Sequence, residues 1–106
     1  MKLLHREGFW YSKYYKYLPK PVPREKPWKG KKEFLKALQM IGELAKIKYY
    51  KGWSNCRICG CKNGSTECEF NGWVWPSGLK HYIEEHNVRP SLAFQEFVLG
   101  KYLDEH

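Results

Sequence analysis

Two cysteines and two histidines in a fixed spacing constrain this chain more than any other feature of its sequence. Cys56 and Cys59 have two residues between them, His81 and His86 have four, and 21 residues separate the two pairs. Thiolate sulfur and imidazole nitrogen are the donors that Zn²⁺ takes in structural sites, where four protein ligands close a tetrahedron. We therefore expect one Zn²⁺ to be bound by Cys56, Cys59, His81 and His86.

Two further cysteines, Cys61 and Cys68, compete with this ligand set. Cys61 follows in the same short turn as the first pair, and Cys68 falls on a predicted strand. A site of three cysteines and one histidine that uses one of them therefore stays open. Free cysteine often packs as a small apolar residue, and we favour that interpretation for Cys68.

Length and composition place the chain among small intracellular domains. At 106 residues it is one domain in length, and a polar domain of this size gains from a structural metal. Charged residues follow Leu4 so soon that no secretory signal is expected, and no apolar run approaches the roughly 18 residues of a membrane span. In a reducing compartment, cytoplasm or nucleus, the thiols are expected to bind metal rather than to form disulfides.

The net charge of +8 is concentrated in one half of the chain. Residues 1–53 carry 14 Lys/Arg against 4 Asp/Glu, whereas residues 54–106 carry 5 against 7. The basic excess therefore lies outside the half that holds the metal ligands. Such an asymmetry indicates an anionic partner, either nucleic acid or an acidic protein surface.

Residues 1–30 are expected to form an extended basic, aromatic and proline-rich arm ahead of a domain at residues 31–106. Residues 9–17 interleave six aromatic side chains with two lysines, and residues 19–27 hold four prolines, which is typical of a stiff connector. Lysines in such an arm can meet phosphates while the rings stack on bases. The alternative is that the rings pack on the domain. The residues expected to contact a partner are Trp10, Tyr11, Lys13, Tyr14, Lys16, Lys20, Arg24, Lys26, Trp28, Lys29, Lys31 and Lys32.

Hydrophobic periodicity predicts three helices. The clearest runs from Lys31 to about Lys48, a second from Ser77 to about Asn87, and a third from Ser91 to about Leu103. The first helix has one broad apolar face, formed by Phe34, Ala37, Leu38, Ile41, Leu44 and Ala45.

A β-hairpin is predicted at Asn71-Gly72, because this dipeptide between two β-type runs is the strongest short hairpin signal. A two-residue turn pairs Phe70 with Trp73, Glu69 with Val74, and Cys68 with Trp75. The fold class expected is thus α+β: a small zinc-stabilised domain with a β-hairpin and about three helices, preceded by the arm.

The order of a cysteine pair, a hairpin and a helix with two histidines resembles the Cys2His2 zinc-finger class over residues 56–86, about a third of the chain. This resemblance implies the same four zinc ligands. The gap between the pairs is longer than the roughly 12–15 residues of the common spacing, and a single module replaces the tandem array of DNA-reading fingers. The helix also carries Glu84 and Glu85 where a helix delivered to phosphates is normally basic. We therefore expect zinc to hold the fold together rather than to position a base-reading helix.

No catalytic activity is expected. The zinc-deaminase order of motifs and a His-Glu-x-x-His helix are both absent from the sequence, and four protein ligands leave no open metal position for water. The predicted function is binding of nucleic acid, RNA in preference to DNA, by the basic aromatic N-terminal half. The alternative is a protein-interaction adaptor, or a small subunit of a larger assembly, whose aromatic arm binds an acidic protein partner.

Overall fold

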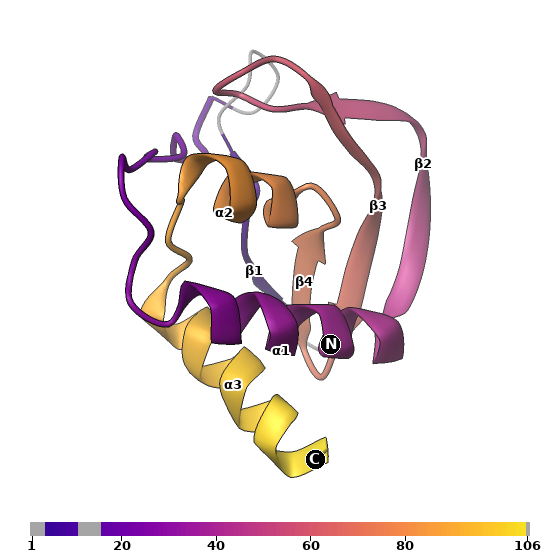
Figure 1. Ribbon diagram of the computed structural model, residues 1–106. Coiled ribbons are helices and arrows are strands. Elements are labelled where there is room, and N and C mark those ends of the chain that lie inside the picture. Colours follow the sequence, from indigo (N-terminus) through magenta and orange to yellow (C-terminus); the bar gives the residue numbers. More distant parts are fainter. Residues whose placement is uncertain (1–3, 11–15, 106) are drawn as a thin grey trace.

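A mixed β-sheet with helices on one of its faces forms the domain (Figure 1). The structure is a computed structural model, and it describes residues 4–10 and 16–105. The four strands of the sheet are hydrogen-bonded in the order β1-β4-β3-β2. Within the described residues the elements are β1 (His5–Arg6), α1 (Lys31–Leu44), β2 (Lys46–Asn55), β3 (Lys62–Phe70), β4 (Trp73–Pro76), α2 (Leu79–His86) and α3 (Leu92–Glu105). The predicted α+β class is confirmed.

The hairpin of β3 and β4 has the predicted register. Phe70 lies opposite Trp73, Glu69 opposite Val74, and Cys68 opposite Trp75. Asn71 and Gly72 form the turn with φ of 45° and 88°, which is the left-handed conformation that a type I′ turn requires at both positions.

The end of the first helix differs from the prediction. α1 ends at Leu44, and Ala45 already has extended dihedrals of −74° and 152°. Residues 46–48 belong to β2 instead, where Lys46 pairs with Glu69 and Ile47 with Cys68. Pairing with β3, which lies far away in sequence, thus overrides the local helical pattern. The sequence prediction missed this strand.

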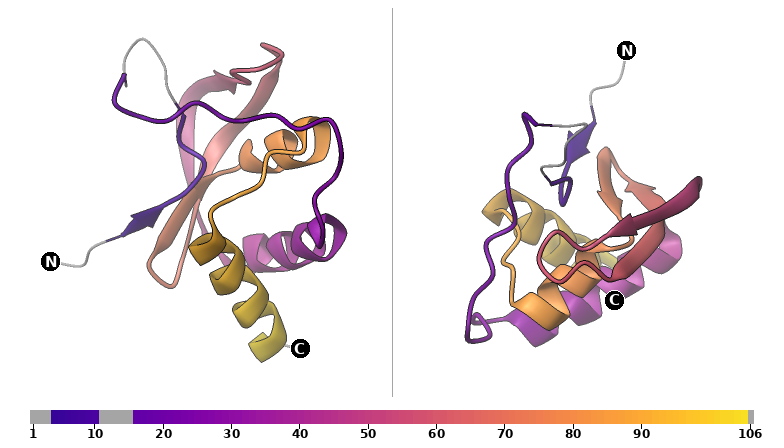
Figure 2. Two further views of the ribbon diagram at one scale, coloured as in Figure 1. Left: turned by 90° about the vertical axis from the view of Figure 1, so that its left-hand side faces the viewer. Right: turned by 90° about the horizontal axis from the view of Figure 1, so that it is seen from above.

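The main core is formed by side chains of the helices and the sheet, and Figure 2 shows how the helices lie against the sheet. The apolar face of α1 is buried as predicted at Phe34, Ala37, Leu38 and Ile41, although Leu44 is half exposed. From α3, Phe94 packs edge-on against Phe34 at 6.0 Å and tilted against Trp75 at 5.5 Å. The sheet supplies Cys68 and Trp75, and α2 supplies Leu79 and Ile83.

The described part of the N-terminal segment lies along the domain rather than away from it. β1 pairs in parallel with β4, with His5 opposite Trp73, and the two rings stack at 4.8 Å. Further along, Arg24 donates its backbone N–H to the carbonyl of His86 at 3.0 Å. The segment thereby passes from the sheet edge to the end of α2 before α1 begins (Figure 2).

Among the described residues, no helix is both long enough and apolar enough to cross a membrane.

Candidate metal centre

The cysteine pair lies in the tight turn that joins β2 to β3. The carbonyl of Cys56 accepts the N–H of Gly60 at 2.9 Å, and the N–H of Cys56 donates to the carbonyl of Cys61 at 2.8 Å. Gly60 has a φ of 81°, a conformation in which glycine is strain-free. The backbone N–H groups of Ile58 and Cys59 lie 3.4 and 3.5 Å from the Cys56 sulfur. The turn therefore directs two backbone N–H groups at the Cys56 sulfur.

Helix α2 supplies the histidines, one from its first turn and one from its last residue. Positions 81 and 86 point about 140° apart on an ideal helix, so both reach one metal only where the helix ends. The structure meets this requirement: Asn87 takes a left-handed φ of 54°, and its N–H donates to the carbonyl of Tyr82. The rings of His81 and His86 then lie 5.2 Å apart between centroids.

The four predicted ligands converge on one point. Their donor atoms all lie within 4.8 Å of one another. The Cys56 sulfur lies 3.4 Å from Nε2 of His86, and the Cys59 sulfur lies 3.4 Å from Nε2 of His81. Zinc bonds of about 2.3 Å to sulfur and 2.0 Å to nitrogen at a tetrahedral angle leave the two atoms about 3.5 Å apart. The group can thus hold a metal ion, and its donors fit Zn²⁺.

Electrostatics at the site favour the metal-binding form of Cys59. The backbone N–H of Cys61, followed by the Cys61 thiol and then His86 and His81, lowers the pKa of Cys59 from 9.0 to about 5. Hydrogen bonding with Cys59 raises the pKa of Cys61. One thiolate is thus favoured within this pair, and the thiolate is the form that binds metal.

The two competing cysteines occupy different places. Cys61 is exposed, and its sulfur lies 3.2 Å from that of Cys59 and 3.4 Å from Nε2 of His81. Cys68 is buried in the main core, and burial raises the pKa of its thiol. The packing agrees with Cys68 as a small apolar residue, whereas Cys61 lies in contact with the metal group.

A second, smaller core surrounds the metal group. Cys56, Tyr82 and Val88 are buried together, with Trp10 and Ile58 packed against them. The Tyr82 hydroxyl accepts the backbone N–H of Arg57 at 2.7 Å, and its pKa is raised by burial. Tyr82 therefore ties α2 to the cysteine turn independently of any ion. Sequence reasoning missed this residue.

Close backbone packing also positions α2 against β3. A Cβ added to Gly64 would lie 2.5 Å from Oγ of Ser77 and 2.9 Å from the backbone nitrogen of Gly78. The Ser77 hydroxyl accepts the backbone N–H of Thr66 at 3.3 Å and makes no hydrogen bond that caps α2. Absence of a side chain at Gly64 lets the two elements approach so closely.

The residues predicted to contact a partner are placed in several different environments. The prediction that Trp28 contacts a partner is wrong, because Trp28 is buried in the main core. Its Nε1 donates to the carbonyl of Val88 at 3.3 Å. Lys31 donates to the Glu84 carbonyl and the Asn87 side chain at the end of α2. Trp10 is half-buried, 5.7 Å from the Tyr82 ring. Exposed cations remain at Lys16, Lys20, Arg24, Lys26, Lys29 and Lys32, whereas Tyr11, Lys13 and Tyr14 lie outside the described residues.

No family model, curated protein or solved structure matches the chain. The metal group and the surface around it therefore carry the functional argument by themselves.

Proposed function

We propose that this chain is a zinc-stabilised module that binds single-stranded nucleic acid, RNA in preference to DNA, through its basic N-terminal half. The Cys2His2 group holds Zn²⁺ as a structural ion, because four protein ligands complete its coordination and leave no position for a reacting water. The chain is in this proposal a binding protein and not an enzyme.

One observation carries the proposal: the basic segment of residues 16–32 is fixed to the metal-binding helix while all of its cations except Lys31 stay exposed. Residues 16–32 contain seven Lys/Arg and one acidic residue, Glu25. The backbone of Arg24 is held on both sides, by the carbonyl of His86 at 3.0 Å and by the side-chain amide of Asn87 at 3.1 Å. A metal ligand thus anchors the segment that would follow a phosphate backbone.

The charge of helix α2 is the reason to propose a single strand rather than a duplex as the ligand. The exposed face of α2 carries Lys80, Glu84 and Glu85, and Lys80 is paired with Glu84 at 3.5 Å. This face has no net positive charge to enter a duplex groove. Single strands, in contrast, are bound by extended basic segments with aromatic rings on which unpaired bases stack.

A salt titration tests the proposal. We expect fluorescence anisotropy to show that labelled single-stranded RNA binds more tightly than single-stranded DNA or duplex DNA of the same length. Its affinity should fall steeply between about 50 and 200 mM salt, since each phosphate contact releases counterions. Replacing Lys26, Lys29 and Lys32 by alanine should reduce the slope of log affinity against log salt by about 2. Lys101→Ala, on α3 far along the chain, is the control.

An affinity for RNA that is insensitive to salt would contradict this function. Capture of partners from a nuclease-treated lysate distinguishes the alternative. A partner that is retained after nuclease treatment, together with no affinity for purified RNA, would favour a protein-interaction adaptor.

A further inference from the structure

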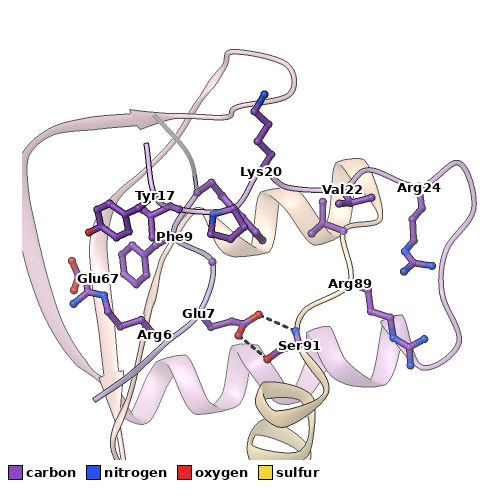
Figure 3. Close-up of a pocket in the computed structure, with 15 residues that line it drawn as sticks. Arg6, Glu7, Phe9, Tyr17, Lys20, Val22, Arg24, Glu67, Arg89 and Ser91 are labelled. Atoms are coloured by element: carbon purple, nitrogen blue, oxygen red, sulfur yellow. Dashed lines mark hydrogen bonds between the residues drawn. The ribbon is translucent and has the colours of Figure 1, made fainter. Parts of the chain in front are cut away.

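A cavity of about 990 Å³ opens beside the N-terminal segment (Figure 3). Its wall is formed by residues 6–10, by residues 17–20 with Val22 and Arg24, by Glu67 of β3, and by Val88, Arg89 and Ser91 of the link between α2 and α3. We call it the N-terminal pocket. Its volume lies at the upper end of the roughly 300–1,000 Å³ that is usual for small-molecule sites.

The two ends of the N-terminal pocket differ in chemistry. Figure 3 shows Phe9 and Tyr17 side by side at one end, and Arg24 and Arg89 at the other. The guanidinium of Arg6 covers the Phe9 ring at 4.4 Å. An aromatic end paired with a guanidinium end suits a ligand with a flat ring at one end and an anion at the other.

The carboxylates of the pocket do not neutralise the two arginines. Glu7 uses both oxygens on Ser91, accepting its backbone N–H at 2.9 Å and its hydroxyl at 2.8 Å. Glu67 lies at the aromatic end, near Arg6 (Figure 3). Among the described residues, no acidic side chain forms an ion pair with Arg24 or Arg89.

The backbone of Arg24 and the side chain of Arg89 are held in place at the arginine end. Hydrogen bonds to the end of α2 fix the backbone of Arg24, and the Arg89 guanidinium lies 5.3 Å from the buried Trp28 ring. The contact of Glu7 with Ser91 ties residues 6–10 to the link between α2 and α3. A pocket formed before binding costs little ordering entropy when the ligand enters.

We propose that the N-terminal pocket holds a short stretch of the bound strand, with a base against Phe9 and Tyr17 and the phosphate of a nucleotide further along the strand on Arg24 and Arg89. One guanidinium group can donate two parallel hydrogen bonds to two phosphate oxygens, which a lysine ammonium group cannot do in a fixed geometry. Aromatic rings stack on any base and so give affinity without sequence preference. This inference rests on the proposed function, since it names the pocket in which a stretch of the bound strand is held.

Variants of the two ends test the assignment. The double substitution Arg24→Gln and Arg89→Gln removes both charges and keeps the side-chain bulk. Phe9→Leu keeps an apolar side chain and removes the stacking surface. We expect each to weaken binding of a single-stranded RNA decamer about tenfold, with zinc content and circular dichroism unchanged. The charge-matched control, Lys36→Gln with Lys101→Gln on α1 and α3, should change affinity no more than about twofold.

NMR titration of the wild-type protein with UMP or AMP distinguishes a bound strand from a free nucleotide. Amide signals at either end of the pocket that shift as much with the mononucleotide as with the decamer would contradict a bound strand and indicate free nucleotide as the ligand. Shifts of the same signals with the decamer but not with UMP or AMP indicate a bound strand. This measurement needs no variant, so it remains decisive if the arginine variant does not fold.

Three outcomes overturn the inference. In the first, the decamer shifts only amide signals of the segment around Lys26 and Lys29, and both pocket variants keep full RNA affinity. RNA would then bind to the basic segment but not in the pocket, and the proposed function would stand. A glutamate-rich peptide that displaces RNA from this pocket and binds as tightly would identify an acidic protein ligand instead. Absence of any RNA binding would remove the proposed function together with the pocket.

Discussion

At the scale of single residues, the metal group has one more donor than a tetrahedral ion takes. Cys56 is buried and its sulfur is approached by two backbone N–H groups, whereas Cys61 is exposed beside Cys59. We therefore expect Cys61→Ser to retain one zinc per chain and Cys56→Ser to lose it, as measured by atomic emission on the dialysed protein. The thermal midpoint should fall sharply in Cys56→Ser and little in Cys61→Ser.

Cys68→Ala is the control for this comparison, because Cys68 lies in the main core and its loss should leave the metal content unchanged. Loss of zinc from Cys61→Ser together with its retention by His81→Ala would contradict the ligand set. That pattern would assign a site of three cysteines and one histidine.

Tyr82 offers a second prediction at this scale, because its hydroxyl connects α2 to the cysteine turn without a metal. Tyr82→Phe removes the acceptor of the Arg57 N–H, which should lower the free energy of unfolding by about 1 kcal/mol. Urea denaturation of the zinc-loaded protein measures this change. Tyr49→Phe is the matched control, since Tyr49 is 77 % exposed. Equal stability of both variants would show that the hydrogen bond contributes nothing.

At the scale of elements, the approach of β3 to the start of α2 depends on Gly64. Gly64→Ala would place a Cβ 2.9 Å from the backbone nitrogen of Gly78, so we expect a loss of about 1–3 kcal/mol by overpacking. Gly100→Ala is the control: it lies within α3, a Cβ added there would meet nothing within 4 Å, and helix propensity should make it neutral or stabilising. Thermal unfolding compares the two. A Gly64→Ala variant as stable as Gly100→Ala would refute the role of this contact.

Elements defined by local signals were the ones that the sequence predicted. The Asn71-Gly72 turn determines the register of its own hairpin, and the apolar face of α1 follows from a spacing of 3.6 residues. β2 was missed because its apolar residues do not all face the core: Tyr49 and Trp53 are 77 % and 61 % exposed. The sequence of β2 therefore lacks the alternation of apolar and polar residues that marks a half-buried strand. Its partner β3 lies beyond the cysteine turn. A strand defined by distant pairing leaves little signal in its own residues.

The candidate site was predictable in its ligands but not in its setting. Donor type and spacing pointed to Cys56, Cys59, His81 and His86, which the fold brings together. The position of the cysteine turn between two long strands depends on β2 and was not foreseen. Nor was the burial of Trp28, because an aromatic residue in a basic, proline-rich segment has the composition of a binding surface whether or not it faces the core.

At the scale of the whole molecule, the metal group and the main core are separate sources of stability. The main core joins α1, α3, the sheet and the inner face of α2 at Leu79 and Ile83, whereas the smaller core around Tyr82 includes Cys56 and Val88. In zinc-finger peptides, metal binding supplies about 10–16 kcal/mol and is the folding free energy. Here the main core has its own buried side chains. Removal of zinc is therefore expected to destabilise the smaller core around Tyr82 more than the main core.

Hydrogen exchange after chelation tests this division. We expect a chelator to abolish protection of amides in residues 54–62 and 84–88 and at Arg24, whose N–H is bonded to His86. Amides of α1 from Phe34 to Ile41 should stay protected, because these side chains pack on α3 and the sheet. Affinity for RNA should fall with the loss of the Arg24 anchor and return when zinc is added. Simultaneous loss of protection in α1 would show that the metal is required for the entire fold. Retention of all protection would show that the ion stabilises neither part.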